Sequence, residues 1–460
     1  MANNVNLQNI QARVFPKKKQ EFIFFNIKDA VQFKAALPKL KVDTSHNVLG
    51  IRRQIETAKA RDAHAIVSVA LVNISFSRSG LTALGIFEHP GGPDDPFEKG
   101  QLADAANLGD VGTRMPDDSF DPSWELAFKS PLDGVLNVAG DSLQRVKSKI
   151  AEIEAIFGRS IEVINQLKGT VRPRENKGHE HFGWSDGISN PTLRNVGGIP
   201  APLPGQLVVS PGVIICGRLA DPVADRPEWA TDGSFLAFRK LQQLVPEFRD
   251  FLLKNPLQET YPDRRKGSEL LGAKLFGRWP SGAPIQLSPL DDDPALGADP
   301  QRNNLFNYPN DHGDAGQNGC PYSAHIRKTQ PRGDLAPSAT EQSGVFRTSI
   351  AYGPELSEDE KNGNTTEFSR GLAFLCYQSS LNHGFRFIQT SWANNIDFIN
   401  GRGIRPGYDA IIGQNSGRAR ETLGTTEGYS KSLPMDFVVS CGGEYFFSPS
   451  IEALRNRFIQ

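Results

Sequence analysis

Strand-like and helix-like segments follow one another in a similar order in the two halves of this 460-residue chain. In the first half, strands are expected at 21–27, 63–77 and 160–172, and helices at 29–40, 77–85 and 142–158. In the second half, strands are expected at 212–217, 234–241 and 371–380, helices at 241–255 and 268–279, and a strand followed by a helix at 444–458. Strands that return antiparallel between helices predict an α+β fold with two similar units.

A segment dense in proline and glycine separates the two halves. It covers residues 188–212, and this composition is typical of a linker. The length of the chain is enough for two or three domains with ample cores. We therefore expect an N-terminal domain over 1–195 and a C-terminal domain over 205–460.

The composition excludes several classes of partner. The 51 basic and 52 acidic residues give a net charge of -1, so there is no general basic field that would favour nucleic acid, nor any hint of attraction to a membrane. No apolar run approaches the roughly 20 residues that span a bilayer. The first residues lack the apolar core of a secretory signal, so we expect either an intracellular protein or a sequence that starts at its mature end. The four cysteines contain no CxxC pair; they permit two disulfides but require none.

Three short segments carry the residues best suited to catalysis. Gly183 and Gly187 flank a carboxylate at Asp186, His325 lies in a segment with cationic neighbours, and a third segment contains Arg347. A lone GxxDG is also an ordinary turn, and a lone histidine is more often structural. Together, however, a metal ligand, a proton carrier and a cation are what peroxide cleavage at haem requires.

The longer runs around these residues resemble the dye-decolourising peroxidases of fungal type. The runs are HFGWSDGISNP (181–191), AHIRKTQPRGD (324–334) and VFRTSIAYGP (345–354), and the resemblance covers nearly the whole chain. It implies two ferredoxin-like domains with antiparallel sheets, related to the dimeric α+β barrel. The GxxDG motif then lies at the end of the first domain, and one haem b per chain is held mainly by the second.

The resemblance also implies roles for individual residues. The catalytic pair is Asp186, as the distal acid–base, and Arg347, as the distal cation. The residues expected to hold haem are His325 as the iron ligand, Arg327 at a propionate, Leu372 and Phe374 as apolar lining, and Asp409 as the partner of the ligand histidine. Asp397 is the second candidate for that partner, and His383 is the competing imidazole. The pair His179 and His181 reads either as a polar loop or as a metal-binding spacing.

Two further features concern electron transfer and manganese. Trp392 and Tyr352 match positions that carry surface radicals in some fungal relatives, although an aromatic side chain is as readily explained by core packing. The acidic run at 355–361 suggests either a Mn²⁺ site, because hard cations select carboxylates, or a solvated face.

The function that the resemblance implies is the oxidation of dyes, phenols and other aromatic donors by H₂O₂ in one-electron steps, with Mn²⁺ as a further possible donor. The alternative is a haem carrier or sensor on the same fold, which would not need Asp186 and Arg347. A second alternative is an α+β protein without haem. No nucleic-acid or membrane partner is expected, and the resemblance implies secretion.

Overall fold

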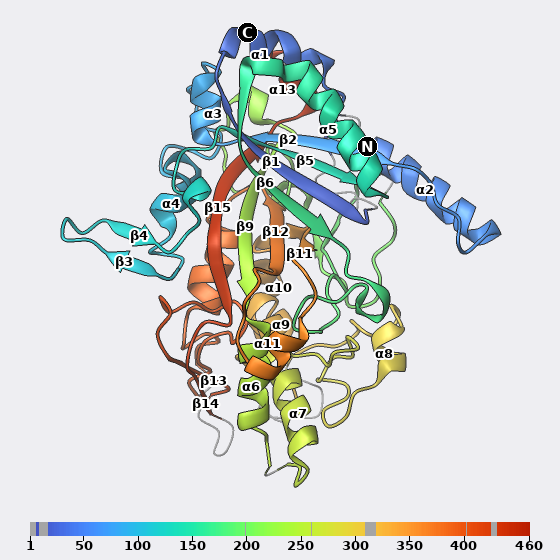
Figure 1. The fold of residues 1–460 in the computed structure, drawn as a ribbon, viewed down its shortest axis with the longest axis vertical. Helices are drawn as coiled ribbons and strands as arrows, with labels where there is room; N and C mark the ends of the chain where they lie inside the picture. The colour runs from blue at the N-terminus through green and yellow to red at the C-terminus, as the bar shows by residue number, and fades with distance from the viewer. Residues whose placement is uncertain are drawn as a thin grey trace.

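The structure is a computed structural model that describes residues 6–8, 17–197, 199–258, 260–308, 319–401, 403–424 and 430–460. Its centre is one antiparallel sheet of nine strands to which both halves of the chain contribute (Figure 1). No helix in the described part of the chain is long and apolar enough to cross a membrane.

The first half of the chain contributes four strands in the order β6-β1-β5-β2. These are β1 (Lys19–Ile27), β2 (Ala70–Phe76), β5 (Gly134–Gly140) and β6 (Ile161–Thr170). The helices α1 (Ala30–Ala36) and α2 (Ser45–Arg61) connect β1 to β2, and α5 (Leu143–Phe157) connects β5 to β6. The spatial order fourth, first, third, second is that of a ferredoxin-like unit.

The second half repeats this order. Its strands are β9 (Ser234–Gln243), β10 (Phe346–Arg347), β11 (Ile350–Tyr352), β12 (Gly371–Gln378) and β15 (Val438–Ser448). β15 pairs with β9, β9 with β12, and β12 with both β10 and β11, all antiparallel. With β10 and β11 taken as one interrupted strand, the order is again fourth, first, third, second.

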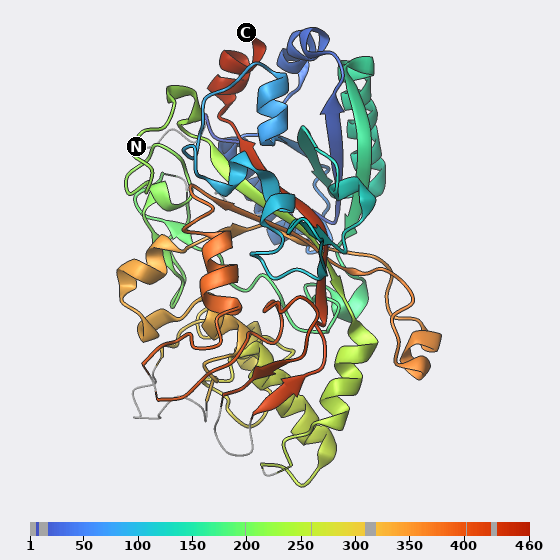
Figure 2. The ribbon, with the colours of Figure 1, turned by 90° about the vertical axis from the view of Figure 1, so that its left-hand side faces the viewer.

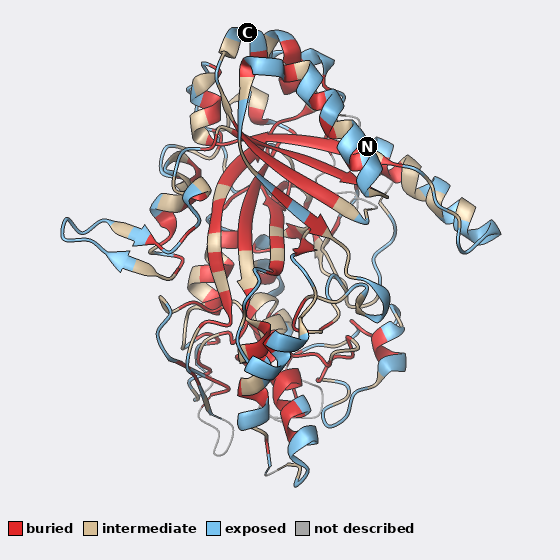
Figure 3. Ribbon diagram, in the orientation of Figure 1, coloured by how far each residue is buried: buried red, intermediate tan, exposed pale blue. Residues whose placement is uncertain are grey.

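The two units close into a barrel through two short seams. β11 meets β6 at Tyr352 and Gly169, and β15 meets β2 at Phe447 and Phe76. Apart from β6, whose residues are mostly exposed or half-buried, the long strands are largely buried in the centre of the molecule (Figure 3). In two perpendicular views, α1, α5 and α13 (Ile451–Arg455) lie at one end of the molecule, and α6 (Val245–Lys254) and α7 (Arg264–Phe276) lie at the other (Figures 1 and 2).

Shorter elements fill the connections. They are α3 (Arg78–Ala83), α4 (Gly100–Asp104), β3 (Gly112–Arg114), β4 (Phe120–Pro122), β7 (Thr192–Leu193), β8 (Val208–Val209), α8 (Pro294–Ala298), α9 (His325–Thr329), α10 (Pro337–Gln342), α11 (Glu358–Gly363), α12 (Phe385–Phe387), the π-helix η9 (Ile388–Ala393), β13 (Arg420–Thr422) and β14 (Lys431–Leu433).

Helix α5 shows how closely a periodic sequence can determine its element. Its apolar residues at 146, 150, 153 and 157 are buried, and the Ser142 side chain caps it by accepting a hydrogen bond from the Arg145 amide. The sequence placed this helix at 142–158, within one residue of its observed ends.

Three sequence-based assignments differ from the structure. The strand expected at 63–77 begins only at Ala70, and the strand expected at 212–217 is instead a turn of 3₁₀-helix at Pro211–Val213. Pro211 explains the second difference, because proline suits the first turn of a helix and cannot donate within a sheet. Helix α2 was missed because only Ser45, Val48 and Leu49 of its residues are buried, so it has almost no apolar stripe.

Candidate active site

A tight loop presents Asp186. The Glu180 carboxylate accepts hydrogen bonds from the amides of Phe182 and Trp184, each at 2.8 Å, and so curls the chain ahead of the aspartate. Gly183 and Gly187 have φ of 105° and 73°, a region that glycine adopts without strain. The Gly187 amide donates to Asp186 Oδ1 at 2.6 Å, which fixes the orientation of the carboxylate. Glu180 has no motif of its own and was not singled out from the sequence.

Arg347 is brought to Asp186 by a two-way link between β10 and the segment after the motif. The Arg347 amide donates to Asn190 Oδ1 at 2.9 Å, and Asn190 Nδ2 donates to the Arg347 carbonyl at 2.9 Å. Arg347 Nη2 also donates to the carbonyl of Ser189 at 3.0 Å. The guanidinium then lies 3.7 Å from Asp186 Oδ1, and both side chains are more than one-third exposed. A small solute can therefore reach both groups.

His325 and Asp409 form the second functional pair. His325 Nδ1 lies 2.8 Å from Asp409 Oδ2, although 84 residues separate them in the chain. The other oxygen of Asp409 accepts the amides of Ile411 at 2.7 Å and Ile412 at 3.1 Å, and the carboxyl is fully buried. Because the Asp409 carboxylate accepts the hydrogen bond, Nδ1 of His325 carries the proton. Nε2 of His325 therefore keeps its lone pair for a metal ion.

The two competing assignments lie elsewhere. Asp397 is at the surface, where it pairs with Arg405 at 2.9 Å. His383 is exposed, and its Nδ1 lies 3.1 Å from the hydroxyl of Ser380. Neither lines the cavity that contains His325.

One cavity unites the two pairs. Asp186, Arg347 and His325 all line it, together with Leu372 and Phe374. Alternate residues of two neighbouring strands form one wall, namely Arg239, Leu241 and Gln243 of β9 and Leu372, Phe374 and Cys376 of β12. The cavity therefore lies mainly against the sheet of the second half.

Comparison with known proteins identifies the family. Residues 9–173 match the DyP dimeric alpha+beta barrel domain, and residues 213–401 match the C-terminal domain of Dyp-type peroxidases. A dye-decolorizing peroxidase from Mycena epipterygia is 41% identical over 98% of this chain and 86% of that protein. The dye-decolorizing peroxidase AauDyP1 from Auricularia auricula-judae is 41% identical over 99% of this chain and 87% of that protein.

The chain belongs to the dye-decolourising peroxidase family.

Solved structures agree with this assignment. A variant of the dye-decolorizing peroxidase from Pleurotus ostreatus superimposes with a TM-score of 0.93 at 42% identity, covering 99% of both chains. The fungal DyP-type peroxidase from Auricularia auricula-judae superimposes with a TM-score of 0.87 at 40% identity, covering 100% of both chains. The predictions of the family, of the α+β fold class and of an H₂O₂-dependent oxidoreductase are confirmed.

Family membership implies haem, and the donor set of the cavity fits this group. His325 offers a metal-binding nitrogen, and Leu372 and Phe374 offer an apolar wall. Arg278 and Arg332 also line the cavity, and both donate to Asn304 Oδ1, at 3.0 and 2.6 Å. Neither arginine pairs with a carboxylate in the described part of the chain, so both positive charges are available to acidic groups of a cofactor.

The expected contact of Arg327 with a haem propionate is corrected by the structure. Arg327 is buried, and its guanidinium forms a bidentate pair with Asp334 at 2.6 and 2.9 Å between the rings of Tyr308 and Tyr322. It does not line the cavity. Arg332, from the same run of sequence, lines the cavity instead.

Trp392 and Tyr352 are not at the surface. Each has 4% of its area exposed, and neither lines the cavity. The ring of Trp392 stacks on Phe398 at 5.2 Å. Tyr352 lies at the β6–β11 seam, and its carbonyl accepts a hydrogen bond from His181 Nε2 at 2.8 Å. Burial lowers the pKa of His181 to about 4, which keeps this imidazole neutral.

The acidic run at 355–361 is already neutralised in part. Glu355 pairs with Arg172, and Glu360 is buried against Arg370 while capping α11. Within the described ranges, no group of three or more His, Cys, Asp or Glu side chains converges as a metal site. All four cysteines are free thiols.

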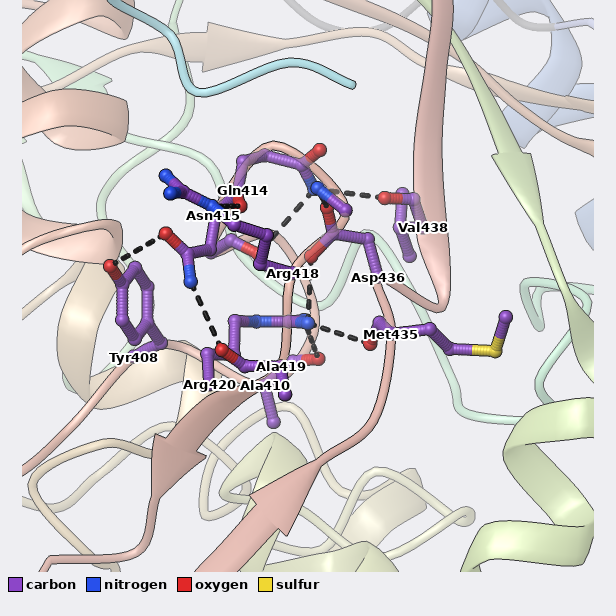
Figure 4. Close-up of polar contacts among 12 residues, drawn as sticks. Tyr408, Ala410, Gln414, Asn415, Arg418, Ala419, Arg420, Met435, Asp436 and Val438 are labelled. Atoms are coloured by element: carbon purple, nitrogen blue, oxygen red, sulfur yellow. Dashed lines mark hydrogen bonds and ion pairs between the residues drawn. The ribbon is translucent and has the colours of Figure 1, made fainter. Parts of the chain in front are cut away.

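A buried ion pair holds the segment that carries Asp409 (Figure 4). Arg420 Nη1 lies 2.7 Å from Asp436 Oδ1, with both side chains almost fully excluded from solvent. Arg420 also donates to the carbonyls of Met435 at 2.6 Å and Ala410 at 3.3 Å, and Asp436 accepts the amide of Gly417 at 3.0 Å. The pair thus ties Ala410, the residue after Asp409, to strand β13 and to the segment at 435–436.

Removal of this cation should cost much more stability than removal of an exposed one. We expect Arg420→Met to lower the free energy of unfolding by about 3–5 kcal/mol, because it leaves the buried Asp436 carboxylate unpaired. Arg405→Met, which breaks the exposed pair with Asp397, should change it by less than about 1 kcal/mol. Urea denaturation of both holoenzymes measures the difference, and equal effects would contradict the structural role of Arg420.

Glu180 should make stability depend on pH. Burial raises the pKa of Glu180 from 4.5 to about 7, against the opposing effect of its amide donors. Because this pKa is higher in the folded than in the unfolded chain, the contribution of Glu180 to the free energy of unfolding is complete below pH 4.5. That contribution is lost as the pH rises through 7. Relative to Glu180→Gln, the wild type should therefore lose about 3 kcal/mol of stability between pH 4.5 and 7.5. Denaturation curves of both proteins across this pH range test the prediction. A difference in stability between them that does not change with pH would refute it.

Proposed function

We propose that this chain is a haem b peroxidase with one haem in the cavity described above, and that it oxidises dyes, phenols and other aromatic donors by one-electron steps. The observation that carries the proposal is the convergence of the His325–Asp409 pair and the Asp186–Arg347 pair on one cavity. The proposal includes the division into domains 1–195 and 205–460, and secretion from the cell.

His325 would hold the iron through Nε2. Asp409 takes the hydrogen bond from Nδ1 and makes the imidazole a stronger electron donor, as such carboxylate partners do for ligand histidines. Arg278 and Arg332 would pair with the acidic groups of haem, and Leu372 and Phe374 would pack against its apolar surface.

When bound, haem supplies the redox-active iron at which peroxide is reduced. Asp186 accepts a proton from one peroxide oxygen and returns it to the departing oxygen, so that the leaving group is water. Arg347 stabilises the negative charge that grows on the departing oxygen as the O–O bond breaks, because its guanidinium remains charged at any working pH. Glu180 and the two glycines keep Asp186 in place.

A haem carrier or sensor is the alternative, and the distal pair argues against it. A carrier gains nothing from a carboxylate and a guanidinium held 3.7 Å apart and open to a small solute. We also retain an electron-transfer role for Trp392 and Tyr352 as a proposal, with transfer through the interior in place of transfer at the surface.

The absorption spectrum of haem-supplemented protein tests the proposal. The ferric Soret band should fall and shift when one equivalent of H₂O₂ is added at mildly acid pH. A Soret band that does not respond would favour the carrier, and protein without any Soret band would exclude haem.

A further inference from the structure

Trp184 is the one readily oxidised aromatic side chain that lines the cavity. Among the described residues of the lining there is no tyrosine and no second tryptophan. The indole is 8% exposed, and its ring stacks on Phe276 with centroids 4.2 Å apart and planes 8° from parallel. Two residues farther along the chain is Asp186, so Trp184 belongs to the same loop as the proposed proton carrier.

The fold makes a dedicated place for this indole. Gly272 lies within helix α7, and a Cβ there would come within 2.8 Å of the Trp184 ring. Glycine in a helix interior lowers the stability of the folded protein by about 0.5–1 kcal/mol relative to alanine. The ring therefore occupies a slot that any larger residue at position 272 would close.

The surroundings of the indole can stabilise positive charge on it. Its Nε1–H donates to the carbonyl of Arg278 at 2.8 Å, and a hydrogen bond from a charged donor is stronger than one from a neutral donor. The carboxyl group of Asp186 is on the same loop. The guanidinium of Arg278 opposes this carboxyl group, but its N–H groups donate to Asn304 and to backbone carbonyls.

The same loop also lines a second hollow, a groove. Phe182 lines this groove, with Arg172, Arg174 and Arg249 among its other lining residues. Phe182 is 6.2 Å from Phe276, the ring on which Trp184 stacks, so the three rings link the groove to the cavity. Within the described chain, Arg174 and Arg249 form no ion pair, whereas Arg172 is paired with Glu355. Glu175 also lines the groove and offsets part of this charge, but Arg174, Arg249 and Lys361 leave the lining net positive. The groove thus offers one aromatic side chain and a net positive charge, which suits an anionic aromatic molecule.

We propose that Trp184 is a redox-active residue that relays electrons from an anionic aromatic donor, such as an aromatic sulfonate, docked in this groove. The inference rests on the proposed peroxidase function. Reduction of one H₂O₂ with two protons to two waters takes two electrons from the enzyme. Trp184 gives up one of them and becomes an indole radical cation, and one donor molecule restores it by losing one electron. A second donor molecule supplies the other electron and completes the turnover.

Trp392 and Tyr352 are less suited to this relay. Both are buried, and neither lines the cavity or the groove. The rings nearest Trp392 are Phe387 and Phe398, and neither of these lines the cavity.

The decisive variant is Trp184→Phe, which preserves the stacking on Phe276 but resists oxidation. Electron paramagnetic resonance of holoenzyme frozen after one equivalent of H₂O₂, without donor, should show a tryptophanyl radical in the wild type and lose it in the variant. Turnover of a sulfonated dye should fall, whereas the peroxide-dependent change of the Soret band should remain. Trp279→Phe is the matched control, because Trp279 is also buried but does not line the cavity. A radical that persists in Trp184→Phe and disappears in Trp392→Phe would overturn the proposal.

Two further measurements keep the test conclusive. If Trp184→Phe also loses the Soret response, Trp184→Tyr decides: a tyrosyl radical with restored dye turnover supports the relay, and behaviour identical to the phenylalanine variant overturns it. Arg249→Glu should raise KM for the sulfonated dye about fivefold and leave KM for an uncharged phenol unchanged. An equal effect on both substrates would exclude the groove. A wild type whose Soret band ignores peroxide would refute the proposed function itself, which is a separate outcome.

Discussion

Asp186→Asn should slow the reaction with H₂O₂ by about two to four orders of magnitude, the range over which a positioned acid–base group accelerates proton transfer. Asparagine has the same shape and can still accept the Gly187 amide, so the loop should keep its conformation. It cannot take up the peroxide proton, and it no longer balances the charge of Arg347. Stopped-flow absorption of the Soret band at a fixed peroxide concentration measures the rate directly.

A second asparagine variant controls for the chemistry of the substitution. Asp118 is exposed, pairs with Arg114, and has a φ of 67°, which asparagine also tolerates. Asp118→Asn should react with peroxide at the wild-type rate. If Asp186→Asn did so as well, Asp186 would not be the proton carrier, and the haem-carrier alternative would regain support.

His325→Ala should produce the other large effect, loss of most of the bound haem and of all peroxidase turnover. The variant removes the metal-binding nitrogen and leaves Oδ2 of the buried Asp409 carboxylate without its hydrogen-bond donor, which is also costly to the fold. Imidazole added to the buffer should restore both haem binding and part of the activity, since it can fill the space and donate to Asp409. Haem content by absorption and the unfolding midpoint separate loss of ligand from loss of fold.

His383→Ala is the matched control for this experiment. His383 is the other imidazole that the sequence offered as a ligand, and it lies exposed beside Ser380. Its replacement should leave haem content unchanged. Loss of haem in His383→Ala together with retention in His325→Ala would reverse the assignment.

Much of the fold and three residues of the site could be predicted from the sequence, because each depends on a local pattern. Helix α5 follows from its apolar spacing, and Asp186, His325 and Arg347 each lie in a distinctive run. Asp409 could be placed only by family resemblance, since nothing near position 409 indicates that the chain returns to His325. Glu180, Arg278 and Arg332 depend on long-range contacts and carry no local pattern.

The misplacement of Arg327 has a simple geometric cause. His325 and Arg327 are two residues apart on α9, and two residues turn a helix by about 200°, so the two side chains point to opposite sides. Arg332 lies beyond the end of this helix, and its backbone has a φ of 49°, which redirects the chain. Once α9 is recognised as helical, Arg327 is excluded from the cavity and the next arginine becomes the candidate.

The order in which the barrel closes has a consequence for biosynthesis. The four strands of the first half are complete once residue 170 has left the ribosome, so this unit can fold while the rest of the chain is still being made. The cavity, in contrast, needs Asp409 and Val438, and β15 seals the barrel against β2 only after the second unit has been made. Cofactor capture must therefore follow synthesis of both units. Until then, the open edges of β2 and β6 are exposed to aggregation, and a supply of haem during expression cannot protect them.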